Sequence, residues 1–253
     1  PVRVGQLRAH SVGLVPSFEL LDVVLLDAGR REALRLPRVV FSLSFRSVLS
    51  LGFDQLFIDA PELEVRRGAD GRLFVGGLEV HGSASPDSDT ADWFFSQHEF
   101  VIRSGTLRWH DEQRGAQPLA LSQVDLVLRN RARRHEIRLD ATPPPGWGQR
   151  FFAVAQFRRP LWSRHAGRWA DWSGQFYAEF AHVDVSQLNR HADFGVQVHE
   201  GQGALRAWVD VDHGVLQGGT VDLAVPQMRA TLGAGLEPLA LRSVRGRVGG
   251  QRL

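Results

Sequence analysis

The chain has 253 residues, enough for one large β domain or two of ordinary size. Its 30 basic residues are all arginine and oppose 28 acidic residues, so the net charge is only +2. The sequence pI of 10.2 overstates the basicity, because without lysine or cysteine almost nothing titrates between neutrality and the pKa of arginine. This balance disfavours a nucleic-acid partner. The missing lysine excludes Schiff-base chemistry, and the missing cysteine excludes disulfides and thiolate metal sites.

The first 47 residues show alternating apolar and polar positions. Leu21, Val23 and Leu25 share one parity, and Phe41, Leu43 and Phe45 repeat the pattern after the turn residues 27–29. Strict alternation indicates a β-strand with one apolar face and one wet face.

Residues 53–80 carry the clearest pattern of the chain. Three alternating runs contain Leu56 and Ile58, then Leu63 and Val65, then Leu73 and Val75. Residues 59–61 and 68–71 separate the runs, and Asp70-Gly71 is a strong hairpin signal because glycine supplies the positive φ of the turn. The pattern predicts an up-and-down antiparallel meander with one apolar face.

A polar stretch, residues 81–90, interrupts the strands. It precedes Trp93, Phe94 and Phe95 in a segment that predicts a short amphipathic helix, capped by Asp89 or Thr90. We therefore expect a first β repeat over 1–80, a loop and short helix at the repeat boundary over 81–99, and further β repeats over 100–253.

Alternation resumes at Phe100 and continues to Val225, around a Trp-rich loop over 160–174 and a short helix within 182–192. In all we expect about fourteen short strands joined mostly by tight turns, an all-β protein. The residues alone leave a sandwich, a barrel and an open curled sheet as alternatives. No run approaches the roughly 18–20 apolar residues that span a bilayer. The chain starts with Pro1 and shows no signal peptide, so we expect a fragment of a longer protein.

Motifs for catalysis and metal binding are weak. The ten histidines lack metal-ligand spacing, and Asp193-Phe194-Gly195 has none of the companion motifs of a kinase. The acidic pairs Asp111/Glu112 and Asp210/Asp212 fall in a turn and on the wet face of a strand. We therefore predict no metal, no cofactor and no enzymatic activity.

The order of features resembles the AsmA-like envelope proteins, most closely their YhdP-type members. The segments that carry the resemblance are GLVPSFELLDVVLLD (13–27), SFRSVLSLGFDQLFIDAPELEVRRGADGRLFVGGLEV (44–80), DWFFSQHEFVIRSGTLRWHDEQRGAQPLALSQVDLVLRNRARRHEIRLDATPP (92–144) and GALRAWVDVDHGVLQGGTVDLAV (203–225). Each segment is little more than strand, turn and strand, and their order gives the resemblance its specificity. The N-terminal transmembrane helix of the family is missing from this chain.

The resemblance implies an elongated, curled antiparallel sheet whose apolar groove carries phospholipid between the inner and outer membranes of Gram-negative bacteria. It further implies a periplasmic location, an inner-membrane anchor outside this fragment and contacts with outer-membrane components. The residues expected to line the lipid groove are Phe41, Leu43, Phe45, Leu56, Ile58, Leu63, Val65, Leu73, Val75, Leu126, Leu128, Ile137 and Leu139. The helix around Trp93 to Phe95 is expected to plug or line the groove.

Two further features have competing interpretations. Arg129, Arg131, Arg133 and Arg134 indicate either a solvated hairpin or a contact with anionic lipid head groups, because arginine binds phosphate bidentately. Trp162, Trp169 and Trp172 indicate either a loop folded back over the sheet or a sugar-stacking site. At the level of the whole chain, the alternatives to lipid transfer are a scaffold that binds outer-membrane protein strands through its open edges, as in TamB-type proteins, and a carbohydrate-binding β-sandwich.

Overall fold

The fold is known from a computed structural model. It describes residues 2–12, 15–26, 32–43, 53–76, 78–80, 92, 95–163, 165–188, 190, 196–233 and 235–251. The strands before residue 81 are β1 (Val2–Arg3), β2 (Gln6–Val12), β3 (Val15–Leu26), β4 (Glu32–Ser42), β5 (Gln55–Asp59), β6 (Glu62–Arg67), β7 (Leu73–Val75) and β8 (Leu78–Val80). The later strands are β9 (Glu99–Asp111), β10 (Leu119–Arg131), β11 (Arg134–Thr142), β12 (Phe151–Arg158), β13 (Ser173–Asp184), β14 (Gln197–Asp212), β15 (Val215–Val225), β16 (Met228–Thr231), β17 (Leu239–Leu241) and β18 (Val244–Gln251). A 3-10 turn η1 (Trp169–Asp171) and a short helix α3 (Val185–Leu188) complete the elements.

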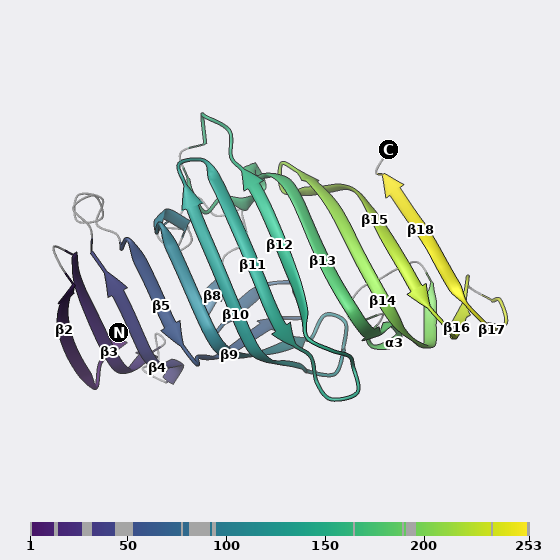
Figure 1. Ribbon diagram of the computed structural model, residues 1–253, viewed down its shortest axis with the longest axis horizontal. Helices are drawn as coiled ribbons and strands as arrows, with labels where there is room; N and C mark the ends of the chain where they lie inside the picture. The colour runs from purple at the N-terminus through teal and green to yellow at the C-terminus, as the bar shows by residue number, and fades with distance from the viewer. Residues whose placement is uncertain are drawn as a thin grey trace.

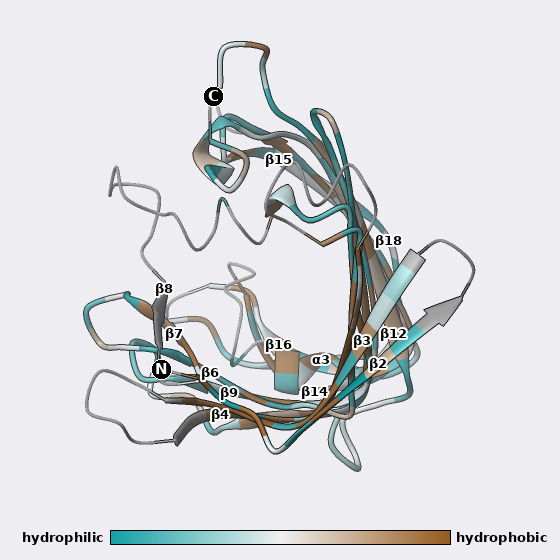
Figure 2. Ribbon diagram, turned by 90° about the vertical axis from the view of Figure 1, so that its left-hand side faces the viewer, coloured by the Kyte–Doolittle hydropathy of each residue, from teal (hydrophilic) through white to brown (hydrophobic). Residues whose placement is uncertain are grey.

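The strands of the described residues form one large, curled sheet that is not closed into a barrel. They follow one another along the long axis of the molecule, from β2 at one end to β18 at the other (Figure 1). Viewed from the end, the sheet curves round on itself, with α3 and β16 on its inner side (Figure 2). The expected all-β, curled fold is confirmed, and neither a sandwich nor a barrel forms in this part of the chain. Strands on both sides of residues 81–99 join the same sheet, and the division into repeats stays a prediction.

One part of the expected topology is wrong. The first two runs of the 53–80 stretch, β5 and β6, do not pair with each other as a meander, because both lie parallel to β9. Gln55 lies beside Glu99 and Glu62 beside Thr106, the same offset along the chain, so β5 and β6 are two halves of one strand. Residues 68–98, which contain β7, β8 and the polar stretch, supply the long crossover that a parallel pair requires. The remaining pairings are antiparallel, and the sheet is therefore mixed.

The segment Asp59-Ala60-Pro61 does not reverse the chain, because the hydrogen bonds to β9 continue through it. The Ala60 N–H donates to the Arg103 carbonyl at 2.8 Å, and the Pro61 carbonyl accepts from the Thr106 N–H at 2.8 Å. Proline is tolerated at such an irregularity, where its missing N–H leaves no gap in the ladder. The expected hairpin at Asp70-Gly71 does form, with Gly71 at φ 81° and β6 paired with β7.

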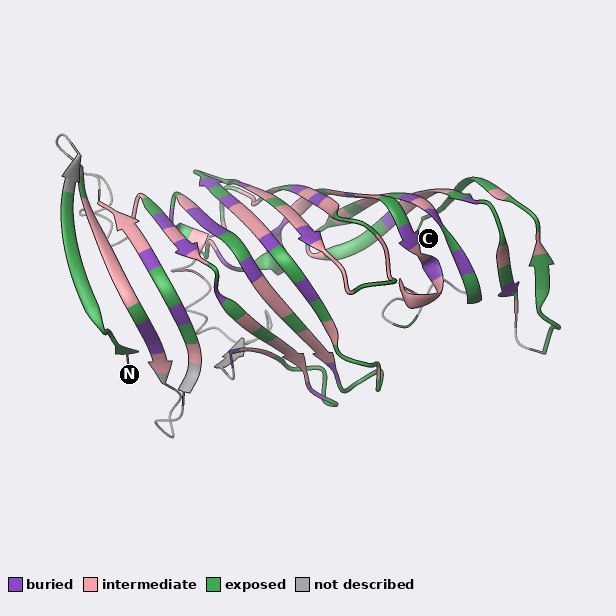
Figure 3. Ribbon diagram, turned by 60° about the horizontal axis from the view of Figure 1, so that its bottom comes forward, coloured by how far each residue is buried: buried purple, intermediate pink, exposed green. Residues whose placement is uncertain are grey.

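Buried residues alternate with more exposed ones along strands such as β5, as the sequence pattern predicts (Figure 3). In β9, Phe100, Val101 and Ile102 are buried in succession. The side chains of α3 identify the inner face, because Val185 and Leu188 pack in one cluster with Leu205 and Val225 of the sheet. Along β10, Leu126 and Leu128 point to this inner face and Val127 to the outer face.

Candidate lipid-binding face

Two rows of apolar side chains cross the inner face from strand to strand. The first row takes one residue from each of eleven paired strands and runs through Leu20, Val39, Ile58, Ile102, Leu126, Leu139, Ala153, Ala178, Ala207, Val221 and Val248. The second row lies at the next inward position of nine of these strands and runs through Phe18, Phe41, Leu56, Phe100, Leu128, Ile137, Ala155, Phe176 and Val209. With strands about 4.8 Å apart, the first row is a continuous apolar path of roughly 50 Å.

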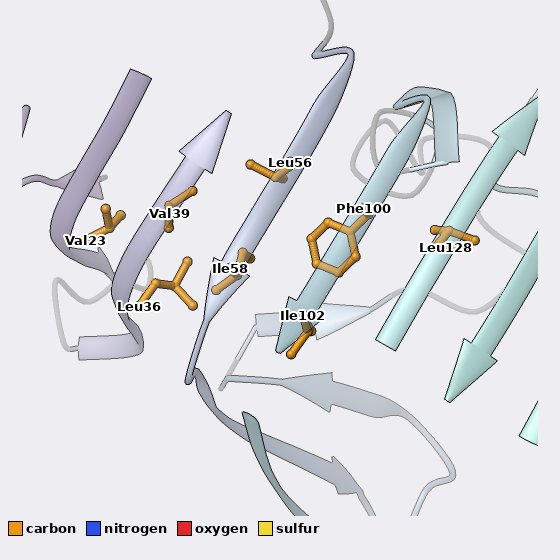
Figure 4. Close-up of a cluster of buried hydrophobic side chains, with 8 residues drawn as sticks. All are labelled: Val23, Leu36, Val39, Leu56, Ile58, Phe100, Ile102 and Leu128. Carbon is orange, nitrogen blue, oxygen red and sulfur yellow. The ribbon is translucent and has the colours of Figure 1, made fainter. Parts of the chain in front are cut away.

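The N-terminal part of these rows is the largest packed cluster. Val23, Leu36, Val39, Leu56, Ile58, Phe100, Ile102 and Leu128 pack together from five strands (Figure 4). Phe95 also packs against this cluster, and Leu128 within it is only 2% exposed. Phe18 and Phe41 stack beside the cluster with ring centroids 5.2 Å apart.

The predicted groove residues fall into three groups. Leu56, Ile58 and Leu128 are buried in this cluster, and Phe41, Leu63, Leu126 and Ile137 pack against it. Leu139 belongs to a neighbouring cluster with Leu121, Val124 and Ala141. Leu43, Val65 and Val75 are half-buried, whereas Leu73 at the start of β7 is 40% exposed. Phe45, Trp93 and Phe94 lie outside the described residues. Lipid contact by these side chains stays a prediction.

Sequence reasoning missed the second half of both rows. Phe176, Val209 and Val221 continue the rows over β13, β14 and β15, where the sequence predicts strands but the predicted groove residues do not extend. Ala153 and Ala178 were also missed, because alanine gives a weak periodic signal. Only the strand register places these alanines in the row, where Ala153 lies beside Leu139 and Ala178 lies between Ala153 and Ala207.

A line of backbone irregularities crosses the first half of the sheet. Asp22, Ala60, Ser104 and Gln123 have positive φ angles of 50°, 46°, 52° and 48°. Strand register aligns them, together with Pro37, across β3, β4, the β5–β6 junction, β9 and β10. Each irregularity inserts one residue, which increases local twist and bends the strand. The strand that carries Leu56 and Ile58 changes direction just past Ile58 (Figure 4).

These insertions keep the apolar side chains on one face. In β5 and β6 the inward residues are Ile58 and then Leu63, and in β9 they are Ile102 and then Leu107. In an unbroken strand, two residues separated by an odd number of positions would point to opposite faces. The extra residue in each strand brings the second of the two side chains back to the inner face, so this face remains apolar across the bend.

A cap covers the inner face at one rim of the sheet, the rim that contains the turn 131–134. Phe95 and Trp172 meet edge to face, with ring centroids 4.7 Å apart, and Trp172 stacks on His135 at 4.2 Å. The Asp92 carboxylate holds the two contributing segments together, because it accepts from the Gly167 N–H at 2.7 Å and contacts His165 Nδ1 at 2.5 Å. The Trp-rich loop thus folds back over the sheet at Trp172.

Beneath the cap lies a small buried polar group. Asn130 Nδ2 donates to the Gln97 carbonyl at 2.7 Å, so Asn130 Oδ1 is the acceptor for His135 Nδ1–H at 2.6 Å. His135 is 1% exposed, and burial is the main cause that lowers its pKa from 6.5 to about 4. The nearby charge of Arg159 lowers this pKa further. His135 is therefore a neutral structural residue under the apolar cap.

The outer face carries charged pairs together with apolar and aromatic side chains, such as Val101 beside Val127 and Tyr177 beside Trp208. Arg38 binds Glu19 at 2.6 Å and Arg247 binds Asp222 at 2.6 Å, and the hydrogen bond from each arginine lowers the pKa of its carboxyl partner. The outer face is therefore mixed in character, whereas the two rows of the inner face are apolar throughout. In the described ranges, no group of three or more histidine, aspartate or glutamate side chains could hold a metal ion. The motif Asp193–Gly195 lies outside those ranges.

The structure thus defines an open, curled β-sheet with one continuous apolar inner face, the architecture expected of an AsmA-like protein. A family model described as YhdP protein matches residues 1–253, and the chain belongs to the YhdP family. The resemblance found in the sequence is therefore confirmed. The family is one of bridge-like lipid-transfer proteins of the cell envelope. Neither the curated proteins nor the solved structures gave a match. In the part of the chain that is described, no helix is long and apolar enough to cross a bilayer.

Proposed function

We propose that this chain is a non-catalytic, periplasmic segment of a lipid-transfer protein that shields phospholipid acyl chains from water between the inner and outer membranes. The observation that carries the proposal is the first apolar row, which continues in register over eleven strands. An acyl chain of about 16 carbons gains on the order of 10 kcal/mol on leaving water, at about 0.8 kcal/mol per CH₂ group.

The uniformity of the row supports passive sliding. Its members are all aliphatic, so a chain displaced by one strand exchanges one apolar contact for another and meets no polar side chain in the row. Membership in a family of bridge-like lipid-transfer proteins supports the same role. An anchor in the inner membrane would lie in a part of the full-length protein beyond these residues.

Photocrosslinking from two adjacent positions on β11 tests the proposal. A benzophenone side chain at position 137 would point to the inner face, and one at position 136 to the outer face. We expect the probe at Ile137 to capture phospholipid in Gram-negative cells and the probe at Glu136 to capture none. Equal capture at both positions, or none at either, would contradict the proposal.

The scaffold alternative predicts a different result in the same experiment. Val248, on the terminal strand β18, is 65% exposed, and β18 pairs with β15 as its single partner among the described strands. A probe at Val248 that captured outer-membrane protein, together with an Ile137 probe that captured no lipid, would favour the scaffold.

A further inference from the structure

The turn between β10 and β11 brings together arginines that lack acidic partners. Arg131 lies directly opposite Arg134, and Arg134 lies opposite Arg158 on β12. Each of the three is the neighbour in sequence of an inward-facing residue, so all three side chains point to the outer face. All three are exposed. None of the three forms an ion pair with any residue that the structure describes. Like charges directly opposite each other in a sheet repel, so this arrangement favours an external anion.

Several other arginines of the outer face have carboxylate partners. The pairs are Arg138 with Asp140 at 2.8 Å, Arg206 with Glu179 at 3.2 Å and Arg247 with Asp222 at 2.6 Å. Arg129, which the sequence grouped with the head-group candidates, binds Glu99 at 2.8 Å. The unpaired group on the strands therefore loses Arg129 and gains Arg158, which only the strand register brings to this place. Arg133, the remaining candidate from the sequence, is exposed in the turn between the two strands.

The most exposed apolar side chains of the described residues lie on the same rim. Leu161 is 76% exposed and Trp162 is 80% exposed, at the tip of the loop that follows β12. Arg159 ties this tip to the arginine-rich turn. Its N–H donates to the Arg133 carbonyl at 3.0 Å, and its guanidinium donates to the carbonyls of Ala132 at 3.2 Å and Ser163 at 3.1 Å.

We propose that this rim docks on the surface of an anionic lipid bilayer. Arg131, Arg134 and Arg158 contact lipid phosphates, for which a planar guanidinium is well shaped. Leu161 and Trp162 enter the interfacial layer, where tryptophan places its apolar ring and its polar N–H favourably. Soluble phosphate would satisfy the arginines but leave the two apolar side chains in water. The docking does not require that acyl chains lie on the inner face.

Flotation with phospholipid vesicles tests the contribution of the arginines. The triple variant Arg131→Gln, Arg134→Gln, Arg158→Gln is compared with Arg138→Gln, Arg206→Gln, Arg247→Gln, which removes the same charge from paired positions on the same face. We expect the first variant to lose about 100-fold in partitioning to vesicles containing phosphatidylglycerol, from about fivefold per arginine. The paired-position variant should lose much less. Phosphatidylcholine vesicles should bind all three proteins weakly, and added salt should weaken binding to the anionic vesicles.

A second pair of variants tests the apolar tip. The double variant Leu161→Ser, Trp162→Ser should lose about tenfold in vesicle binding, together with the quenching of tryptophan fluorescence by brominated lipid. Leu236→Ser is the control, because Leu236 is 60% exposed in a different loop. Equal losses in the two arginine variants, full binding by the Leu161 and Trp162 variant, or binding of inorganic phosphate without binding of vesicles would each overturn the inference. A chain that binds vesicles but yields no lipid from the Ile137 probe would refute the proposed function and leave this inference standing.

Discussion

Replacing Leu126 by glutamate tests whether acyl chains lie on the inner face. Leu126 sits in the first apolar row between Ile102 and Leu139, and it is half-buried. Its neighbour Val127 is also half-buried but points to the outer face, beside Arg138. The matched control is therefore Val127→Glu, which adds the same charge one residue away on the opposite face.

The expected effect follows from the geometry of the row. An extended chain of about 16 carbons is roughly 20 Å long and crosses about four strands that are about 4.8 Å apart. One strand then contacts about four CH₂ groups, which contribute about 3 kcal/mol at about 0.8 kcal/mol each. A carboxylate at Leu126 removes that contact, so the affinity for phospholipid should fall about 100-fold. Val127→Glu should change it by less than about twofold.

Native mass spectrometry of the purified variants measures the retained lipid, and circular dichroism checks that the β signal is preserved. Leu126→Gln serves as a second variant, in which the added polar group carries no charge. If Leu126→Glu and Val127→Glu retain the same amount of lipid while both remain folded, acyl chains do not lie along this row.

Three further predictions concern the fold. The pKa of His135 is lowered to about 4, so between about pH 6.5 and 4 the unfolded chain binds a proton that the folded chain does not. The free energy of unfolding should therefore fall by about 3 kcal/mol as the pH is lowered through this range. His135→Leu should remove this pH dependence, which urea unfolding at a series of pH values measures. Asp111 has a side chain that is 1% exposed and paired with Arg67, so Asp111→Ala should cost about 3 kcal/mol, whereas Glu112→Ala, at an exposed pair, should cost less than about 1 kcal/mol. Ala60 has φ 46°, so Ala60→Val should lower the melting temperature through a penalty of about 1–3 kcal/mol, and Ala60→Gly should be nearly neutral; equal stability of the two variants would contradict a left-handed conformation at this position.

The sequence by itself determined the class of fold and most of the first half of the apolar face. Alternation at Leu56 and Ile58 and at Leu126 and Leu128 is a local property, because successive side chains of a strand point to opposite faces whatever the strand pairs with. Turn chemistry is equally local, and the hairpin at Asp70-Gly71 formed as predicted. The order in which the quoted segments follow one another along the chain also sufficed to identify the family.

Tertiary structure decided which strands are neighbours. Local signals did not distinguish a turn at Asp59–Pro61 from a kink, because proline and a short polar segment are compatible with both. The difference lies in the hydrogen bonds to β9, whose residues are 44 positions further along the chain, as in the pairing of Gln55 with Glu99. Arg158 likewise joined the unpaired arginines only because β12 lies beside β11.

The parity change at the bend shows how the local sequence pattern and the pairing of strands across the sheet combine. In the sequence, Leu56 and Ile58 stand in one phase and Leu63 and Val65 in the other, and this shift by itself predicts a boundary between two strands. The structure places one extra residue at the same level in several adjacent strands. Period-2 patterning fixes which residues share a face within a run. Only the register across the sheet determines whether two runs share the same face, because that depends on hydrogen bonds between residues far apart in the sequence.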